Sequence, residues 1–155
     1  MDAPETLTPL HPDFIKVMRI SGALLALVPL IGIGVLEFAE LVPRGALLVP
    51  ALLLLGYFVW VLPQRRYARW GYVAGEDRLR IQRGYMFYSD TVVPFGRIQH
   101  MDVDQGPIER RYGLATFSAH TAGTHGSTIT LPGLPHEDAL ALRERIRDHI
   151  KRAQA

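Results

Sequence analysis

The residues best suited to chemistry lie in one short segment, where a histidine and two aspartates alternate with apolar residues. His100, Asp102 and Asp104 occupy positions i, i+2 and i+4, so a regular β-strand would present all three on one face. An imidazole beside two carboxylates could bind a divalent metal ion or exchange protons with a substrate. The same alternation with Met101 and Val103 is also what any half-exposed strand shows. We therefore favour the structural interpretation over an enzyme site.

Other polar residues give weaker signals for catalysis or metal binding. The spacing of His120 and His125 matches no zinc motif. Ser89 beside Asp90, and Ser118 near His120, lack the nucleophile-elbow motif that accompanies a catalytic serine. The chain has no cysteine, which excludes disulfides, thiolate metal sites and a cysteine nucleophile. The sequence therefore predicts a protein that is not an enzyme, with no catalytic residue, cofactor, metal ion or small-molecule substrate.

The elements that must position these residues begin with two long apolar runs. Residues 20–36 and 45–62 contain no charged side chain. As a helix the second run is about 27 Å long, close to the roughly 30 Å hydrocarbon core of a bilayer. The sequence predicts a two-helix transmembrane hairpin over residues 16–63. Residues 1–15 precede it as an N-terminal tail, in which the proline-rich residues 1–13 are expected to be disordered.

Flanking charges predict the orientation of this hairpin. Lys16 and Arg19 precede the first apolar run, and three arginines closely follow the second. The turn at residues 37–44 carries one arginine and two acidic residues. Because basic residues are retained on the cytoplasmic side, we expect both termini in the cytoplasm and this turn outside.

Residues 64–155 are predicted to form one small soluble domain of antiparallel strands, a sandwich or a barrel. Short alternating segments separated by turn residues indicate strands at residues 67–73, 78–83, 85–93, 100–104, 115–119 and 126–131. Ile98 is out of phase with Met101 and Val103, which predicts either a bulge or the start of a strand near Gln99.

The C-terminal residues follow a helical pattern. Within residues 135–152 apolar side chains recur at helical spacing, at Ala139, Leu142, Ile146 and Ile150. The sequence predicts one amphipathic helix that caps an open end of the sheet.

The stretch from residue 93 to residue 115, VPFGRIQHMDVDQGPIERRYGLA, carries the most specific motif. It resembles the bacterial pleckstrin-homology-like (PH-like) membrane proteins of the YdbS-like type. The matching positions are Pro94, Arg97, Ile98, Gln99, Asp102, Val103, Gln105, Gly106, Pro107, Arg110, Tyr112, Gly113, Leu114 and Ala115. Met101 stands where a valine is more usual, and the resemblance covers roughly residues 15–152.

This resemblance implies a membrane-anchored α+β fold. A two-helix transmembrane hairpin is followed at residues 64–155 by a cytoplasmic PH-like antiparallel β-barrel or sandwich, capped by a C-terminal α-helix. The resemblance also implies a multi-pass protein of the bacterial cytoplasmic membrane, and as partner a larger membrane protein with repeated PH-like domains. It implies no reaction.

Six arginines form the predicted partner or lipid surface. They are Arg65, Arg66, Arg69, Arg97, Arg110 and Arg111. For the last three we favour a structural alternative, in which they hold their own loop by bonding carbonyl groups, Asp102 or Asp104. Beyond residue 63 the net charge is +4, which suits an anionic lipid surface but is too mild and too scattered for nucleic acid.

We therefore predict a binding or scaffold protein that acts through protein–protein assembly at the membrane. Its partner would be a second PH-like membrane protein or another copy of this chain. The alternative is a sensor of anionic lipid headgroups that uses the membrane-proximal arginines.

Overall fold

The computed structural model describes residues 7–40, 43, 45–84, 87–122 and 128–154. The chain divides into two compact units. One is Ile15–Arg65, which holds the helical hairpin. The other combines Met1–Phe14 with Arg66–Ala155, and holds the strands and the C-terminal helix.

The hairpin unit consists of two helices, each long and apolar enough to cross a membrane. Helix α1 (Phe14–Phe38) has 25 residues. The second helix has 20 residues and is continuous through α2 (Leu48–Gly56), the π-helical segment η1 (Tyr57–Val61) and α3 (Leu62–Tyr67). At 1.5 Å per residue the two are about 38 and 30 Å long. Only 6% of the apolar window in each is buried, so their apolar side chains face outward as lipid contact requires. The predicted pair of apolar helices is confirmed.

The turn of the hairpin is held by one carboxylate. Glu37, in the last turn of α1, accepts hydrogen bonds from the backbone N–H groups of Gly45, Leu47 and Leu48 at 2.9, 2.9 and 2.8 Å. N–H groups at the start of a helix have no acceptor within that helix, so a side chain must supply one. Glu37 is only 8% exposed. The end of the first helix therefore caps the beginning of the second.

A second contact joins the two helices nearer their other ends. The guanidinium carbon of Arg19 lies 4.7 Å from the centroid of a Trp60 ring. A cation over an indole face is attracted by the ring quadrupole. This contact pins the π-helical segment to α1.

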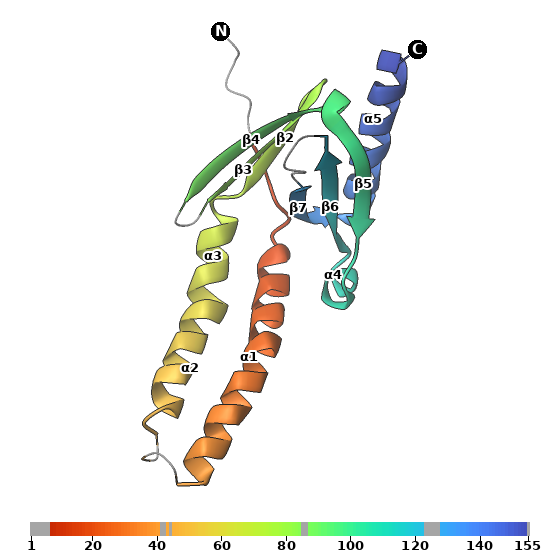
Figure 1. Ribbon diagram of the computed structural model, residues 1–155. Coiled ribbons are helices and arrows are strands. Elements are labelled where there is room, and N and C mark those ends of the chain that lie inside the picture. Colours follow the sequence, from red (N-terminus) through yellow and green to blue (C-terminus); the bar gives the residue numbers. More distant parts are fainter. Residues whose placement is uncertain (1–6, 41–42, 44, 85–86, 123–127, 155) are drawn as a thin grey trace. The chain divides into compact units, whose positions relative to one another are not determined.

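The second unit contains two antiparallel sheets (Figure 1). Sheet A has the order β1 (Thr8–Pro9), β2 (Gly71–Ala74), β3 (Arg78–Gly84), β4 (Tyr88–Pro94). Sheet B has the order β5 (Ile98–Asp104), β6 (Leu114–Thr121), β7 (Thr128–Pro135). The other elements are the 3₁₀ turn η2 (Phe95–Arg97), helix α4 (Pro107–Arg111) and helix α5 (His136–Gln154).

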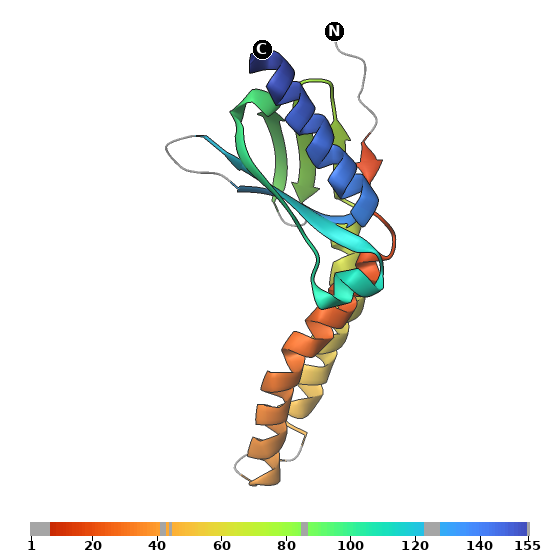
Figure 2. The same ribbon diagram turned by 90° about the vertical axis from the view of Figure 1, so that its right-hand side faces the viewer.

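Both sheets contribute to one core, which α5 closes (Figure 2). Its fully buried members include Leu79, Ile81, Phe95, Phe117, Leu131, Ala139 and Ile146. Burying one large apolar side chain is worth about 1.5–3 kcal/mol, so these residues set the stability of the unit. The predicted apolar stripe of the C-terminal helix faces this core, which confirms its capping role.

The two sheets do not close into a barrel. Within the described residues β4 pairs with β3 alone, and β7 pairs with β6 alone. The fold is therefore the PH-like pair of sheets with a C-terminal helix, open between β4 and β7.

The N-terminal residues differ from the expected disordered tail. Thr8 and Pro9 pair with β2, and Leu10 is 2% exposed in the core. The backbone N–H of His11 donates to the carbonyl of Gly133, and the Tyr67 hydroxyl donates to the carbonyl of Leu10. Residues 7–13 are thus an integral part of the strand-containing unit. Two paired residues are too few to show a strand periodicity in the sequence.

Several expected strand boundaries also shift. The segment predicted from residue 67 begins as a strand only at Gly71, because α3 continues to Tyr67. The last strand runs through Pro132 and Gly133 to Pro135, past residues that normally interrupt strands. The bulge predicted near Gln99 is confirmed, because the β5–β6 register shifts between Ile98 and His100.

Candidate functional site

The motif loop between β5 and β6 is held by an amide and a carboxylate. Gln105 donates to the carbonyl of Leu114 at 2.7 Å. Glu109 accepts from the backbone N–H of Gly106 at 2.8 Å and from the Thr116 hydroxyl at 2.7 Å. These bonds stabilise the short helix α4. A carboxylate three residues into a helix commonly caps its first turn in this way.

The arginines of the motif do not hold this loop. Arg97 ends η2, and Arg110 and Arg111 end α4, with all three side chains exposed. Among the described residues, no hydrogen bond or ion pair engages their guanidinium groups. The structural alternative for these arginines, loop anchoring through carbonyls or aspartates, is therefore wrong.

The membrane-proximal arginines follow the second long helix. Arg65 and Arg66 lie in α3, and Arg69 lies in the turn before β2. All three are exposed. Arg65 belongs to the hairpin unit, whereas the other five predicted surface arginines belong to the strand-containing unit.

In the structure His100 and Asp102 lie beside His120, and not beside Asp104 as the sequence predicted. Asp102 lies 3.0 Å from Nε2 of His100 and 3.5 Å from Nε2 of His120. His100 and His120 are direct cross-strand partners, whereas Asp104 is paired with Thr116. All three members of the group are exposed, by 69%, 42% and 46% for His100, Asp102 and His120.

This group is a surface ion-pair cluster. Within the described part of the chain, no set of three or more His, Asp or Glu side chains is arranged to hold a metal ion. His125, which the sequence pairs with His120, lies outside the described residues. The cross-strand register, invisible in the sequence, is what brings His120 to Asp102.

A groove runs along the open side of the two sheets. It has a volume of about 390 Å³ and lies between the outer edge of β4 and the adjoining ends of β6 and β7. Its walls are uncharged except for two arginines, Arg83 and Arg97. The other lining residues are Ile81, Thr91, Val92, Val93, Pro94, Thr121, Ala122, Thr128 and Ile129.

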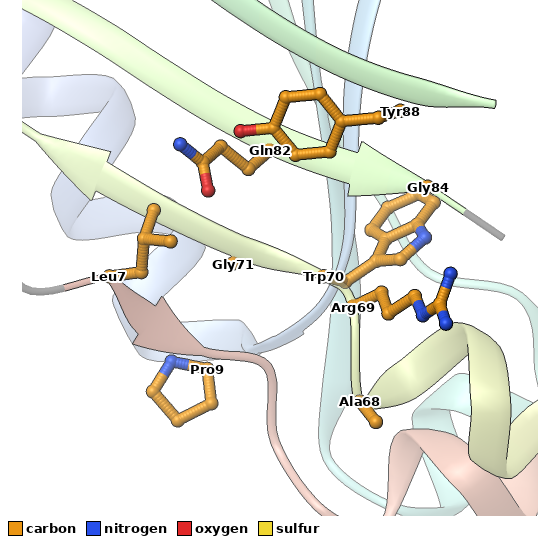
Figure 3. Close-up of a pocket in the computed structure, with 9 residues that line it drawn as sticks. All are labelled: Leu7, Pro9, Ala68, Arg69, Trp70, Gly71, Gln82, Gly84 and Tyr88. Atoms are coloured by element: carbon orange, nitrogen blue, oxygen red, sulfur yellow. The ribbon is translucent and has the colours of Figure 1, made fainter.

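A larger cavity, of about 630 Å³, lies on sheet A beside β1 (Figure 3). Its lining residues are Leu7, Pro9, Ala68, Arg69, Trp70, Gly71, Gln82, Gly84 and Tyr88. The rings of Trp70 and Tyr88 flank it, and the Gln82 side chain lies between Tyr88 and the β1 side (Figure 3). The sequence did not predict this cavity, because its lining comes from a residue before β1, the turn before β2 and four strands that lie far apart in the chain.

Asp90 is the carboxylate next to this cavity, and its charge is compensated. Arg80 contacts it at 2.6 Å, and the Gln82 amide donates to it at 3.1 Å. Hydrogen bonds from Arg80, then from Gln82 and Tyr88, hold the pKa of Asp90 below its usual value, against the opposing effect of partial burial. The Asp90 carboxylate therefore stays ionised and paired.

Comparison with known proteins identifies the family. The family model of the bacterial PH domain matches residues 19–150. The UPF0699 transmembrane protein YdbS of Bacillus subtilis (strain 168) is 34% identical over 151 residues, which cover 92% of this chain and 89% of the relative. No solved structure gives a significant match. Two apolar helices, two antiparallel sheets and a C-terminal helix agree with these matches, and the chain belongs to the bacterial PH-domain family of membrane proteins.

Proposed function

We propose that this protein is a non-enzymatic, membrane-anchored module that binds an extended segment of a protein partner in the groove between β4 and β7. The partner is another PH-like membrane protein or a second copy of the chain. The observation that carries the proposal is the pair of unpaired strand edges that border this groove.

The groove fits a strand-like segment. An edge strand presents free backbone N–H and C=O groups, to which an extended peptide adds as a further strand. Val92 is 49% exposed beside the β4 edge, so an apolar side chain on the partner has a surface to cover. Arg83 and Arg97 are the charged groups lining the groove, and they favour an acidic residue on the bound segment.

The hairpin restricts where this binding occurs. We infer that both helices cross the cytoplasmic membrane and that both termini lie in the cytoplasm, because more basic residues flank the hairpin ends than its turn, which has one arginine and two acidic residues. A partner in the same membrane then meets the groove at a raised local concentration.

The test is the mass of the complex formed by the tagged full-length protein, purified in a mild detergent. We expect a discrete complex larger than one chain. Val92→Asp and Arg97→Glu should dissociate it, because both place negative charge in the groove. Arg110→Glu, which reverses an exposed charge outside the groove, should leave it intact. A lone monomer, or equal loss with the Arg97 and Arg110 variants, would contradict the proposal.

A second candidate function is contact with an anionic lipid surface. It is supported by Arg65, Arg66 and Arg69, which are exposed directly after the second long helix. Each basic residue near such a surface contributes about 1 kcal/mol. Contact of this kind should weaken steeply as ionic strength rises, whereas the groove complex, held mainly by backbone and apolar contacts, should persist.

A further inference from the structure

We propose that the cavity beside β1 is a binding site for the phosphate-bearing headgroup of an anionic phospholipid. The inference rests on the second candidate function and assigns it a defined site. It is independent of the groove, which lies along the other edge of sheet A.

The charge of the cavity suits a phosphodiester. Arg69 is the one charged residue among the nine that line it. A guanidinium group matches two phosphate oxygens with parallel N–H donors, which makes arginine well suited to this anion. The neighbouring carboxylate of Asp90 is already engaged by Arg80 and Gln82, so it offers little repulsion.

Two of the residues that line the cavity are glycines, Gly71 and Gly84. Gly71 pairs with Gln82 across β2 and β3, and Gly84 pairs with Tyr88 across β3 and β4. Neither glycine projects a side chain into the space. At Gly84 an added Cβ would lie 2.9 Å from the Phe87 carbonyl oxygen, so a larger residue would displace the β3–β4 turn.

The aromatic residues suit the boundary between water and lipid. Trp70 and Tyr88 both line the cavity, away from Leu7 and Pro9 (Figure 3). Phe87, next to Tyr88, is 83% exposed. Tryptophan and tyrosine collect at membrane interfaces because each has an apolar ring and a polar group. The Tyr88 ring and the indole can cover the glycerol region of a lipid whose phosphate meets Arg69.

The cavity is linked to the second long helix by a short length of chain. That helix ends at Tyr67, and Arg69 and Trp70 follow by two and three residues. Three residues reach at most about 11 Å. The basic residues Arg65 and Arg66 lie in the last turn of the same helix.

The fluorescence of Trp70 provides a direct test. The chain has two tryptophans, so Trp60→Phe leaves Trp70 as the only reporter. This full-length protein is placed in nanodiscs of phosphatidylcholine with increasing fractions of phosphatidylglycerol. We expect a saturable change in Trp70 emission. Adding glycerol phosphate to pure phosphatidylcholine discs should not reproduce it, which separates a lipid headgroup from a free phosphate ester.

Two pairs of variants locate the binding. Arg69→Gln should raise the phosphatidylglycerol fraction at half-saturation by more than the roughly fivefold expected from losing one surface charge, because it also removes the paired N–H donors that meet the phosphate. Arg65→Gln, a matched exposed arginine outside the cavity, should show only that surface-charge effect. Tyr88→Ser should also weaken binding. Tyr88 is 72% exposed, so this change leaves the core intact. Tyr112→Ser, a tyrosine outside the cavity, is its control.

Each other outcome overturns the inference. Equal weakening by the Arg65 and Arg69 variants would show a diffuse charge contact, which keeps the second candidate function but removes the cavity as its site. A response to glycerol phosphate equal to that to phosphatidylglycerol would show a site for a soluble phosphate ester. No dependence on phosphatidylglycerol would remove both the site and the second candidate function.

Discussion

At the scale of single residues, backbone conformation makes specific demands on two glycines, Gly113 and Gly133. Gly113 has φ +66° and nothing within 4 Å of an added Cβ, whereas Gly133 has φ +71° and an added Cβ there would lie 2.5 Å from Cγ of Phe14. Gly96 has neither constraint. The three positions therefore separate the cost of backbone strain from the cost of steric overlap.

We expect Gly113→Ala to lower the free energy of unfolding by about 1–2 kcal/mol, the cost of a left-handed conformation with a Cβ. Gly133→Ala should cost more, because overpacking adds about 1–3 kcal/mol. Gly96→Ala is the control and should be nearly neutral. Chemical denaturation, monitored through the spectroscopic signal of the β-strands, gives the free energy of unfolding of each variant and so ranks the three. An equal effect at all three positions would contradict it.

Asp90 makes a pH-dependent contribution at the same scale. Its pKa is lowered in the folded protein, chiefly by Arg80, so folding favours the ionised carboxylate. The stabilisation should be fully present above the unfolded-state pKa of about 3.9 and be lost as pH falls through the lower folded-state pKa. The stability difference between wild type and Asp90→Asn should therefore be constant from pH 5 upward and shrink below about pH 4, measured by thermal unfolding at each pH.

A control separates the ion pair from general acid destabilisation. Asp104→Asn removes an exposed aspartate on another strand. Its stability difference from wild type should not follow the pH profile of the Asp90 variant. A flat profile for Asp90→Asn would show that the Arg80 contact adds no stability.

At the scale of elements, the hairpin depends on Glu37. Glu37→Ala leaves the backbone N–H groups of Gly45, Leu47 and Leu48 without their acceptor. We expect it to lower the thermal unfolding midpoint in detergent and to increase proteolysis at the turn. Glu37→Gln keeps one acceptor oxygen and should be intermediate. Glu40→Gln, an exposed neighbour, is the control, and equal effects at both positions would contradict the capping role.

The elements also show what could be predicted from the sequence. The two apolar helices and most strands follow from local sequence patterns. Residues that these patterns place on the inner face, such as Leu79, Ile81 and Ile146, are buried in the core. Strand β1 and helix α4 were missed because two and five residues are too short for a periodic pattern. The His100–Asp102–His120 group and the two cavities depend on long-range register, which no local pattern encodes.

At the scale of the whole molecule, membrane orientation is the first property to establish. The chain has no cysteine, so single cysteines can report on each side. We expect Pro43→Cys, in the hairpin turn, to react with a membrane-impermeant maleimide in intact cells. Ala153→Cys, in α5, should react only after lysis. The reverse pattern would invert the proposed topology, and reaction of both in intact cells would contradict a cytoplasmic strand-containing unit.

The pairing of β1 with β2 has a consequence for biosynthesis. Because residues 8 and 9 bond to residues 72 and 71, the hairpin of residues 15–65 is an insertion within a discontinuous strand-containing unit. Leu10 emerges from the ribosome long before Leu131 and Ile146, the core residues with which it clusters. The unit can therefore complete its fold only after both long helices have been synthesised. Deleting the first thirteen residues would remove part of the core, even though these residues precede the first long helix.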